Sequence, residues 1–196
     1  MNALFSQIKP HLFAVGFFLA ITLAYFAPLL DGKDILQSDM THAAGMAQEL
    51  KHYHDTSGKY AQWTNSMFSG MPAYHVGPYT PNYNLFAHLS SFIGLKLSMT
   101  SAGIIFAMML CFYLLLYLMG MNTWFSVAGA VAYAFSTYNF IIIEAGHVTK
   151  AWAIAYIPLI IAGTILLYRK KYLIGFLISL LGIGLNMSRN HLQITY

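Results

Sequence analysis

Charged side chains are scarce in this sequence, and their scarcity excludes most classes of soluble protein. Of the 196 residues, 8% are charged and 58% are hydrophobic, whereas a soluble domain has about 25% charged residues. This composition excludes a disordered chain, a nucleic-acid-binding module and an ordinary cytosolic enzyme. The basic residues are scattered and form no patch, so the net charge of +4 indicates no nucleic-acid partner.

Cysteine is almost absent as well. Cys111 is the only cysteine and lies within an apolar run, so the chain can form neither an internal disulfide nor a cysteine metal cluster. His52 and His54 lie close to Asp55, but their spacing places the two imidazoles on different faces of a helix. The sequence therefore predicts no metal site.

Long uncharged segments take the place of the missing charges. Residues 10–30, 97–143, 151–168 and 172–188 contain no Asp, Glu, Lys or Arg. A transmembrane helix needs about 20 apolar residues, and the second segment is long enough for two helices separated at Gly120-Met121-Asn122. Five buried helices in so short a soluble chain would have no polar surface to enclose them. We therefore predict an all-α integral membrane protein with about five transmembrane helices, at residues 11–30, 100–119, 124–143, 152–168 and 172–188.

The basic residues of the short loops predict the orientation of these helices. Arg169-Lys170-Lys171, the densest basic cluster, joins the fourth and fifth segments and is expected in the cytoplasm. Counting back along the chain puts Lys9 and the N-terminus in the cytoplasm too, and residues 31–98 and 144–151 outside. All acidic residues then lie on the extracytoplasmic side: Asp31, Asp34, Asp39, Glu49, Asp55 and Glu144. The first segment is long and lacks a clear cleavage site, so we interpret it as an uncleaved helix rather than a signal peptide.

Residues 31–98 form an extracytoplasmic loop that is too long for a plain connector. Two parts of it have the apolar spacing of helices that lie along the membrane surface. The apolar face of the first, Met40–His54, consists of Met40, Ala43, Ala44, Ala47 and Leu50. That of the second, Leu85–Leu97, consists of Leu85, Leu89, Phe92, Ile93 and Leu97. The segment between them, Thr56–Asn84, shows no period, and its larger side chains are expected to pack against the helices: Trp63, Met67, Phe68, Met71 and Tyr74.

The last residues predict that the sequence is the N-terminal fragment of a longer protein. After Arg189-Asn190-His191 the chain continues with Leu-Gln-Ile-Thr-Tyr196, like the start of another apolar segment, and no polar tail follows. We expect residues 1–196 to form a single transmembrane domain that inserts into a membrane but is inactive in isolation.

Three groups of polar residues are predicted to meet at the outer membrane face. Three acids follow the first transmembrane segment, a Glu-His-Lys group lies between the third and fourth, and an Arg-Asn-His group follows the fifth. Carboxylates at such a site can accept a proton from a hydroxyl, and cations can stabilise a leaving anion. Each group also has a structural alternative: a solvated turn for Asp31–Asp34, the N-cap of a helix starting at Met40 for Asp39, and membrane-edge charges for Glu144 and Lys150.

Four segments resemble the YfhO-like family of bacterial multi-pass membrane proteins, which is similar to the GT-C class of glycosyltransferases. They are Leu36-Gln-Ser-Asp-Met40, Trp63-Thr-Asn-Ser-Met-Phe-Ser-Gly-Met-Pro-Ala73, Glu144-Ala-Gly-His-Val-Thr-Lys150 and Asn190-His-Leu-Gln-Ile-Thr-Tyr196. The segments are spread over the whole chain, and the spacing of the transmembrane segments agrees with the family. Proteins of this family are much longer, in agreement with the expected fragment.

The resemblance implies a transferase in the bacterial cytoplasmic membrane. It would move a sugar from a polyprenyl-phosphate donor to an envelope polymer or lipid on the extracytoplasmic side, with no further cofactor. Asp39, in the first outer loop, is implied as the acidic residue that serves the reaction. Because Ser38 precedes it, the pair of acids frequent in the class is absent and no metal role is expected. Substrate binding is expected for eight residues in or directly beside the matching segments: Trp63, Asn65, Glu144, His147, Lys150, Arg189, Asn190 and His191.

Two other functions stay open at this point: a transporter or flippase of lipid-linked sugar, and a non-catalytic scaffold for envelope assembly. Ion-coupled transporters commonly place ionisable residues near the membrane midplane. The predicted transmembrane segments contain no acidic or basic residue other than histidine. The acids on the outer side therefore favour the transferase.

Overall fold

The computed structural model describes residues 2–76, 84–96 and 101–196. Regular structure in these residues is helical apart from one antiparallel ribbon, as the predicted all-α fold class requires. The helices are α1 (Asn2–Tyr25), α2 (Ala27–Leu30), α3 (Ser38–Met46), α4 (Gln48–Ser57), α5 (Leu85–Ile93), α6 (Ser101–Leu118), α7 (Thr123–Ala134), α8 (Thr137–Ala145), α9 (Val148–Tyr168), α10 (Tyr172–Met187) and α11 (Leu192–Thr195). The ribbon consists of β1 (Trp63–Thr64) and β2 (Met71–Pro72), and the 3-10 helix η1 (Ala73–His75) follows it.

The chain divides into two compact units, and the single transmembrane domain stays a prediction. Unit 1 comprises Met1–Asp34, Asn84–Ile143 and His147–Tyr196, and unit 2 comprises Ile35–Tyr83 and Glu144–Gly146. Most of the long loop predicted after the first transmembrane segment therefore has a compact structure of its own. The helix α5, predicted as part of that loop, belongs to unit 1.

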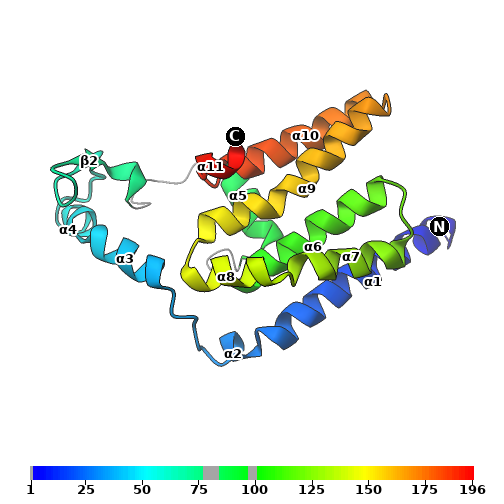
Figure 1. Ribbon diagram of the computed structural model, residues 1–196, viewed down its shortest axis with the longest axis horizontal. Coiled ribbons are helices and arrows are strands. Elements are labelled where there is room, and N and C mark those ends of the chain that lie inside the picture. The colour runs from blue at the N-terminus through cyan, green and yellow to red at the C-terminus, as the bar shows by residue number, and fades with distance from the viewer. Residues whose placement is uncertain (1, 77–83, 97–100) are drawn as a thin grey trace. The chain divides into compact units, whose positions relative to one another are not determined.

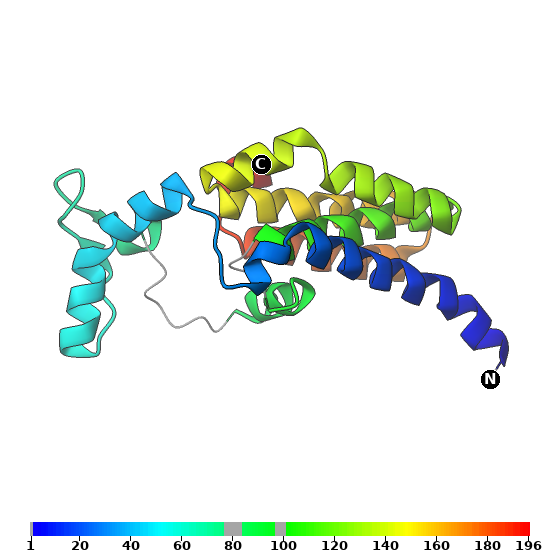
Figure 2. The same ribbon diagram turned by 90° about the horizontal axis from the view of Figure 1, so that it is seen from below.

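Unit 1 is a bundle of apolar helices. Within it α9 packs against both α6 and α10, and α6 also packs against α7 and α1 (Figures 1 and 2). The core contains large side chains such as Phe18, Tyr113 and Trp152. Apolar side chains also cover the outside of the bundle, including the exposed Leu173 and Phe176 of α10. A bundle that is apolar both inside and outside is suited to a lipid environment.

Among the described residues, three helices are long and apolar enough to cross a membrane: Gln7–Tyr25 of α1, α6 and α9. The helices α7 and α8 supply a fourth if they count as one span, although they meet at a bend of 42°. The helix α10 is apolar but has 16 residues, fewer than a typical span. The structure thus supports a membrane protein with three clear candidate spans, and the number of five remains a prediction.

The helix predicted over residues 124–143 is interrupted between Ala134 and Thr137. Asn139, which is 3% exposed, donates hydrogen bonds from Nδ2 to the carbonyl oxygens of Tyr133 at 2.9 Å and Ala134 at 3.3 Å. A bilayer interior offers no water to backbone groups released by such a break. The Asn139 amide takes the place of that water, so the polar side chain stabilises the bend.

The helix predicted over residues 11–30 is interrupted as well. The helix α1 ends at Tyr25, and α2 begins at Ala27 with Pro28 in its first turn. Proline has no N–H, so a continuous helix would lose the hydrogen bond from position 28 to the carbonyl four residues earlier. The candidate span accordingly ends at Tyr25 rather than near residue 30.

Glycines let α9 and α10 approach each other closely. A Cβ atom on Gly175 would lie 2.8 Å from the backbone nitrogen of Leu167, and one on Gly182 would lie 2.9 Å from that of Ile160. Small residues at such contacts are typical of helix pairs in membranes, where close van der Waals packing holds helices together. Any larger residue at these two positions would push the helices apart.

The basic turn between α9 and α10 also supports α6. The two Nη atoms of Arg169 donate to the carbonyl oxygens of Leu118 and Met119, each at 3.1 Å. The last carbonyl groups of a helix have no partner within the helix. Arg169 therefore caps α6 from a distant part of the sequence.

Unit 2 has a small core of its own. Its buried residues are Ala47, Leu50, Ala73 and Val76, and Met67 and Met71 pack against them as predicted. The other large side chains predicted to pack in this segment are mostly exposed: Trp63 (54%), Phe68 (84%) and Tyr74 (62%). The prediction was wrong for these three because the core of unit 2 contains few apolar side chains, and these are too few to bury three more large residues.

Of the two helices predicted in the long loop, the first is divided into two and the second is shorter than expected. The segment Met40–His54 is divided at Ala47 into α3 and α4, and the predicted face is buried only at Ala47 and Leu50. The other helix, α5, ends at Ile93. Its predicted face also differs, because Leu85 and Phe92 are 74% and 72% exposed, while Phe86, Leu89 and Ile93 pack against the core of unit 1. Leu97 lies outside the described residues.

Candidate functional site

Asp39 lies in the first turn of α3 and is exposed. The helix begins at Ser38, with Gln37 as its N-cap, and the Gln37 side chain makes no capping hydrogen bond. The alternative role of Asp39 as the N-cap of a helix starting at Met40 is therefore wrong. A carboxylate in the first turn still interacts favourably with the helix dipole.

The turn Glu144–Gly146 packs against the start of α3 within unit 2. The Ser38 hydroxyl donates to the carbonyl oxygen of Ala145 at 3.3 Å. A Cβ atom on Gly146 would lie 3.0 Å from the Asp39 Cβ and 3.2 Å from the Met40 nitrogen, and the φ of Gly146 is +95°. Both the contact and the backbone angle require glycine here. Two of the four segments that carry the family resemblance are thus in direct contact, 107 residues apart in the sequence.

Cationic and imidazole side chains gather at the start of α9 in unit 1. Lys150 lies over the ring of Tyr138, with its Nζ 5.3 Å from the centroid. Burial lowers the pKa of His191, and the nearby Lys150 and His147 lower it further. The turn between α8 and α9 and the turn after α10 therefore bring together three of the residues predicted to bind substrate.

Arg189 lies against aromatic side chains of α9. Its guanidinium carbon is 4.7 Å from the centroid of the Trp152 ring. Burial lowers the Arg189 pKa, and the neighbouring Tyr156 hydroxyl partly offsets this decrease. Arginine nevertheless remains charged in proteins. Tyr156 is itself hydrogen-bonded to Ser90 of α5. Among the described residues the buried Arg189 Nε has no hydrogen-bond partner, so the site contains a buried donor that can accommodate an acceptor.

Asn190 has a positive φ of 53° at the turn between α10 and α11 and is exposed. Asparagine tolerates this left-handed conformation better than most residues, which gives it a structural role in the turn. The following helix α11 is held by a buried amide: Thr195 Oγ1 donates to Asn186 Oδ1, and Asn186 Nδ2 donates to the Ala153 carbonyl oxygen, each at 2.8 Å. The C-terminal segment of the family resemblance thus packs against α9 and α10.

Trp63 and Asn65 lie in unit 2: Trp63 is the first residue of β1, and Asn65 follows β1 directly in the loop toward β2. Glu49 of α4 holds this loop through one oxygen, Oε2, which accepts hydrogen bonds from Thr64 Oγ1 and from the backbone nitrogens of Asn65 and Ser66, each of these two at 3.0 Å. These hydrogen bonds lower the pKa of Glu49, the one from Thr64 most of all. Glu49 is therefore ionised at neutral pH.

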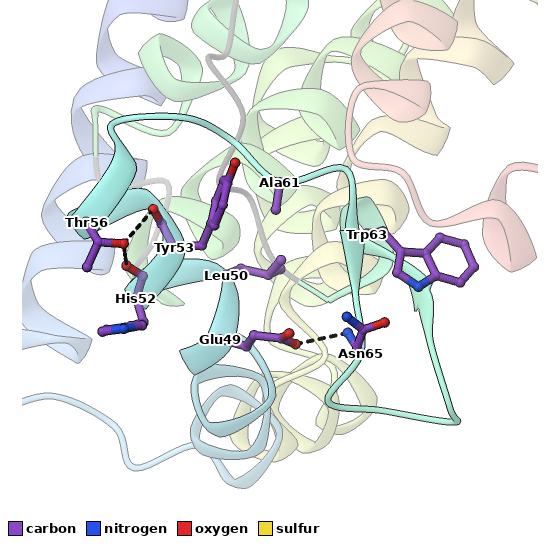
Figure 3. Close-up of a pocket in the computed structure, with 8 residues that line it drawn as sticks. All are labelled: Glu49, Leu50, His52, Tyr53, Thr56, Ala61, Trp63 and Asn65. Carbon is purple, nitrogen blue, oxygen red and sulfur yellow. Dashed lines mark hydrogen bonds between the residues drawn. The ribbon is translucent and has the colours of Figure 1, made fainter.

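A pocket of about 360 Å³ lies beside Glu49. We call it the unit 2 pocket; its lining residues, drawn in Figure 3, are Glu49, Leu50, His52, Tyr53, Thr56, Ala61, Trp63 and Asn65. All of them belong to unit 2. The figure shows the Asn65 amide between the Glu49 carboxylate and the Trp63 indole, so three polar or aromatic groups form one edge of the pocket.

The predicted site residues therefore form three groups. Asp39 and Glu144 lie in unit 2 near the Gly146 turn, and Trp63 and Asn65 line the unit 2 pocket. The remaining predicted residues lie in unit 1: His147, Lys150, Arg189, Asn190 and His191. Sequence reasoning missed Glu49, Trp152 and Tyr156 as partners of these residues. A signal existed only for Glu49, as an acid in a helix next to the Trp63–Ala73 segment.

The described part of the chain contains no group of three or more His, Cys, Asp or Glu side chains that could hold a metal ion. No family model, curated protein or solved structure matches the chain. The resemblance to the YfhO-like family therefore remains a prediction that depends on the four segments alone.

Proposed function

We propose that this chain is the N-terminal part of a bacterial membrane glycosyltransferase of the GT-C type. It would transfer a sugar from a polyprenyl phosphate to an envelope polymer or lipid on the extracytoplasmic side of the cytoplasmic membrane. The observation that carries the proposal is the buried Arg189 Nε, which lacks a partner among the described residues. An unsatisfied buried donor costs about 1–3 kcal/mol, and a phosphate oxygen of the donor would remove this cost.

The surroundings of Arg189 support an anionic ligand in two further ways. Lys150 and His147 lie at the start of α9, a helix of 21 residues, and the N-terminus of a helix attracts anions through its exposed N–H groups and dipole. In the described part of the chain, the contacts of Lys150 and Arg189 are with aromatic rings rather than with carboxylates. Their charges are therefore available to stabilise a leaving phosphate.

Asp39 is the proposed catalytic base. The acceptor hydroxyl must lose a proton as it attacks the sugar, and a carboxylate within reach can accept it, usually for a gain of about 10²–10⁴ in rate. Asp39 is exposed, and the Gly146 turn holds the backbone around it. The same proposal includes five spans, a cytoplasmic N-terminus and an extracytoplasmic unit 2.

Kinetics of variants of the full-length protein in native membranes test this proposal. We expect Asp39→Asn to lower turnover by about 10²-fold or more with little change in the apparent donor affinity. Arg189→Ala should lower turnover and also weaken the apparent donor affinity, because it removes a contact with the phosphate. Asp31→Asn is the matched control, since Asp31 is an exposed acid that ends α2. Unchanged turnover per folded molecule of Asp39→Asn would overturn the role of the base.

The bend between α7 and α8 favours a second candidate, a transporter or flippase of lipid-linked sugar. Interrupted helices supply substrate-binding backbone groups in many transporters. Here, however, Asn139 already occupies the Tyr133 and Ala134 carbonyl groups, which leaves fewer of them for a substrate. The test is the flux of a lipid-linked sugar across the membrane of liposomes that contain the protein. Equal flux for Asp39→Asn and wild type would favour the transporter.

A further inference from the structure

The unit 2 pocket has the chemistry of a carbohydrate site, and we propose that it binds a neutral sugar ring of the acceptor. The sugar would lie along the edge formed by Glu49, Asn65 and Trp63 (Figure 3). Its role as the acceptor rests on the proposed transferase function, whereas the binding of a sugar does not.

Glu49 offers a hydrogen-bond acceptor to this pocket. Three hydrogen bonds from the loop end at Oε2. A carboxylate has about four acceptor positions, so Oε1 can accept hydrogen bonds from two neighbouring sugar hydroxyls. The loop meanwhile holds the carboxylate in a fixed position, which reduces the entropy lost on binding.

Asn65 supplies both a donor and an acceptor next to Glu49. Its backbone nitrogen is hydrogen-bonded to Glu49 at 3.0 Å, while its exposed side-chain amide makes no hydrogen bond within the described parts of the chain. An amide can donate to one hydroxyl and accept from another. The backbone therefore positions Asn65 and leaves its side chain available to a ligand.

Trp63 supplies an apolar surface beside these polar groups. A Cβ atom on Gly70 would lie 3.0 Å from the indole Cζ2, so one side of the ring is held against the loop. The indole is nonetheless 54% exposed. The electron-rich face of an aromatic ring attracts weakly positive C–H groups, which line one face of many pyranose rings.

The charge of the pocket selects against phosphorylated and acidic sugars. The lining contains the Glu49 carboxylate and no Lys or Arg, so a ligand anion would be repelled by a like charge. The cationic residues Lys150 and Arg189 lie in unit 1 instead. The two units would thus divide the substrates between them, with the donor phosphate bound by unit 1 and the acceptor sugar by unit 2.

Isothermal titration of the full chain in lipid nanodiscs tests the proposal. The probes are the methyl glycosides of glucose, galactose and N-acetylglucosamine, with glucose 6-phosphate as the charged comparison. We expect at least one neutral glycoside to bind and glucose 6-phosphate to bind at least tenfold more weakly. Asn65→Ala should weaken binding about fivefold, as expected for one hydrogen bond, and Trp63→Ala about tenfold or more.

Two variants of the same loop are matched controls. Gln62→Ala removes an exposed amide and Phe68→Ala an exposed aromatic ring, and neither residue lines the pocket. Both should bind the glycoside as the unchanged chain does. Wild-type protein that binds no neutral glycoside, or an Asn65→Ala variant that binds as tightly as wild type, would overturn the inference. Glycoside binding together with an absence of transferase activity in the full-length protein would instead overturn only the proposed function.

Discussion

The ionised form of Glu49 holds the loop that begins at β1, and this makes the loop sensitive to acid. The hydrogen bonds lower the Glu49 pKa below its ordinary value of 4.5. Their contribution to stability is therefore complete above pH 4.5 and is lost as the pH falls through the lower, folded-state pKa. We expect the hydrogen-exchange protection factors of the Asn65 and Ser66 amides to fall in that range. Glu49→Gln should lose this pH dependence and Asp55→Asn should keep it; equal pH profiles for Glu49→Gln and wild type would contradict the prediction.

His191 has a pKa that reports on the cations near it. Burial lowers this pKa most, followed by the charges of Lys150 and His147. Because the folded-state pKa lies below the ordinary value of 6.5, the stability contributed by neutral His191 decreases as the pH falls below that value. Lys150→Gln should raise the His191 pKa, and inorganic phosphate should raise it in the wild type, as measured by NMR of the ring protons. Lys51→Gln is the control, and a Lys150→Gln titration identical to wild type would refute the proximity of the two groups.

Most of the candidate site residues could be selected from the sequence, but most of the residues that contact them could not. Asp39, Lys150 and Arg189 could be selected because isolated charges at the ends of apolar segments are conspicuous. The cation–π contact of Arg189 with Trp152 depends on how α9 packs beside the turn after α10, which no local pattern encodes. Glu49 was not selected as a site residue, because its partners lie 15 to 17 positions further along the chain.

At the scale of elements, the packing of α9 on α10 depends on Gly175. The Cβ atom of a valine at this position would lie 2.8 Å from the backbone nitrogen of Leu167, which is too close for two non-bonded atoms. We expect Gly175→Val to destabilise the helix pair by about 1–3 kcal/mol and to lower the unfolding temperature in detergent, measured by tryptophan fluorescence. Gly16→Val is the matched control, because a Cβ on Gly16 of α1 would meet nothing within 4 Å. Equal unfolding temperatures for the two variants would show that the close approach is unimportant.

The sequence predicted the apolar helices better than their interruptions. Runs without charge located α6 and α9 to within a few residues, because hydrophobicity alone decides where a helix can enter lipid. The breaks depend on single residues whose effect comes from tertiary contacts. Asn139 stabilises the bend after Ala134 only because its amide reaches two freed carbonyl groups, and nothing in its neighbours in the sequence indicated this.

At the scale of the whole molecule, cysteine labelling measures the orientation of the chain in the membrane. In a Cys111→Ala background, we expect Ser57→Cys to react with a membrane-impermeant thiol reagent added to intact cells and Lys170→Cys to react only after permeabilisation. The reason is that basic loops stay in the cytoplasm. Ser57 is exposed at the end of α4, and the buried Cys111 is removed to exclude background labelling. Labelling of Lys170→Cys from outside would invert the topology and place unit 2 in the cytoplasm.

The contact between the Gly146 turn and the start of α3 lay beyond any local prediction. Periodicity describes a helix face, and composition describes a membrane segment, but neither indicates that residues 107 positions apart meet. The positive φ of Gly146 is equally invisible, because glycine is common in loops of every conformation. The prediction that these polar segments meet at one membrane face therefore named no particular contact between them.

The close approach of α9 and α10 also bears on how the protein enters the membrane during synthesis. A helix of 16 residues is short for insertion on its own. The glycine contacts at Gly175 and Gly182 and the short basic turn join it to α9, which is long enough to span. We expect the two helices to leave the translocon as one hairpin, with α9 carrying its shorter neighbour into the lipid. Separation of the pair by a long polar insertion at Lys170 should then leave α10 outside the bilayer.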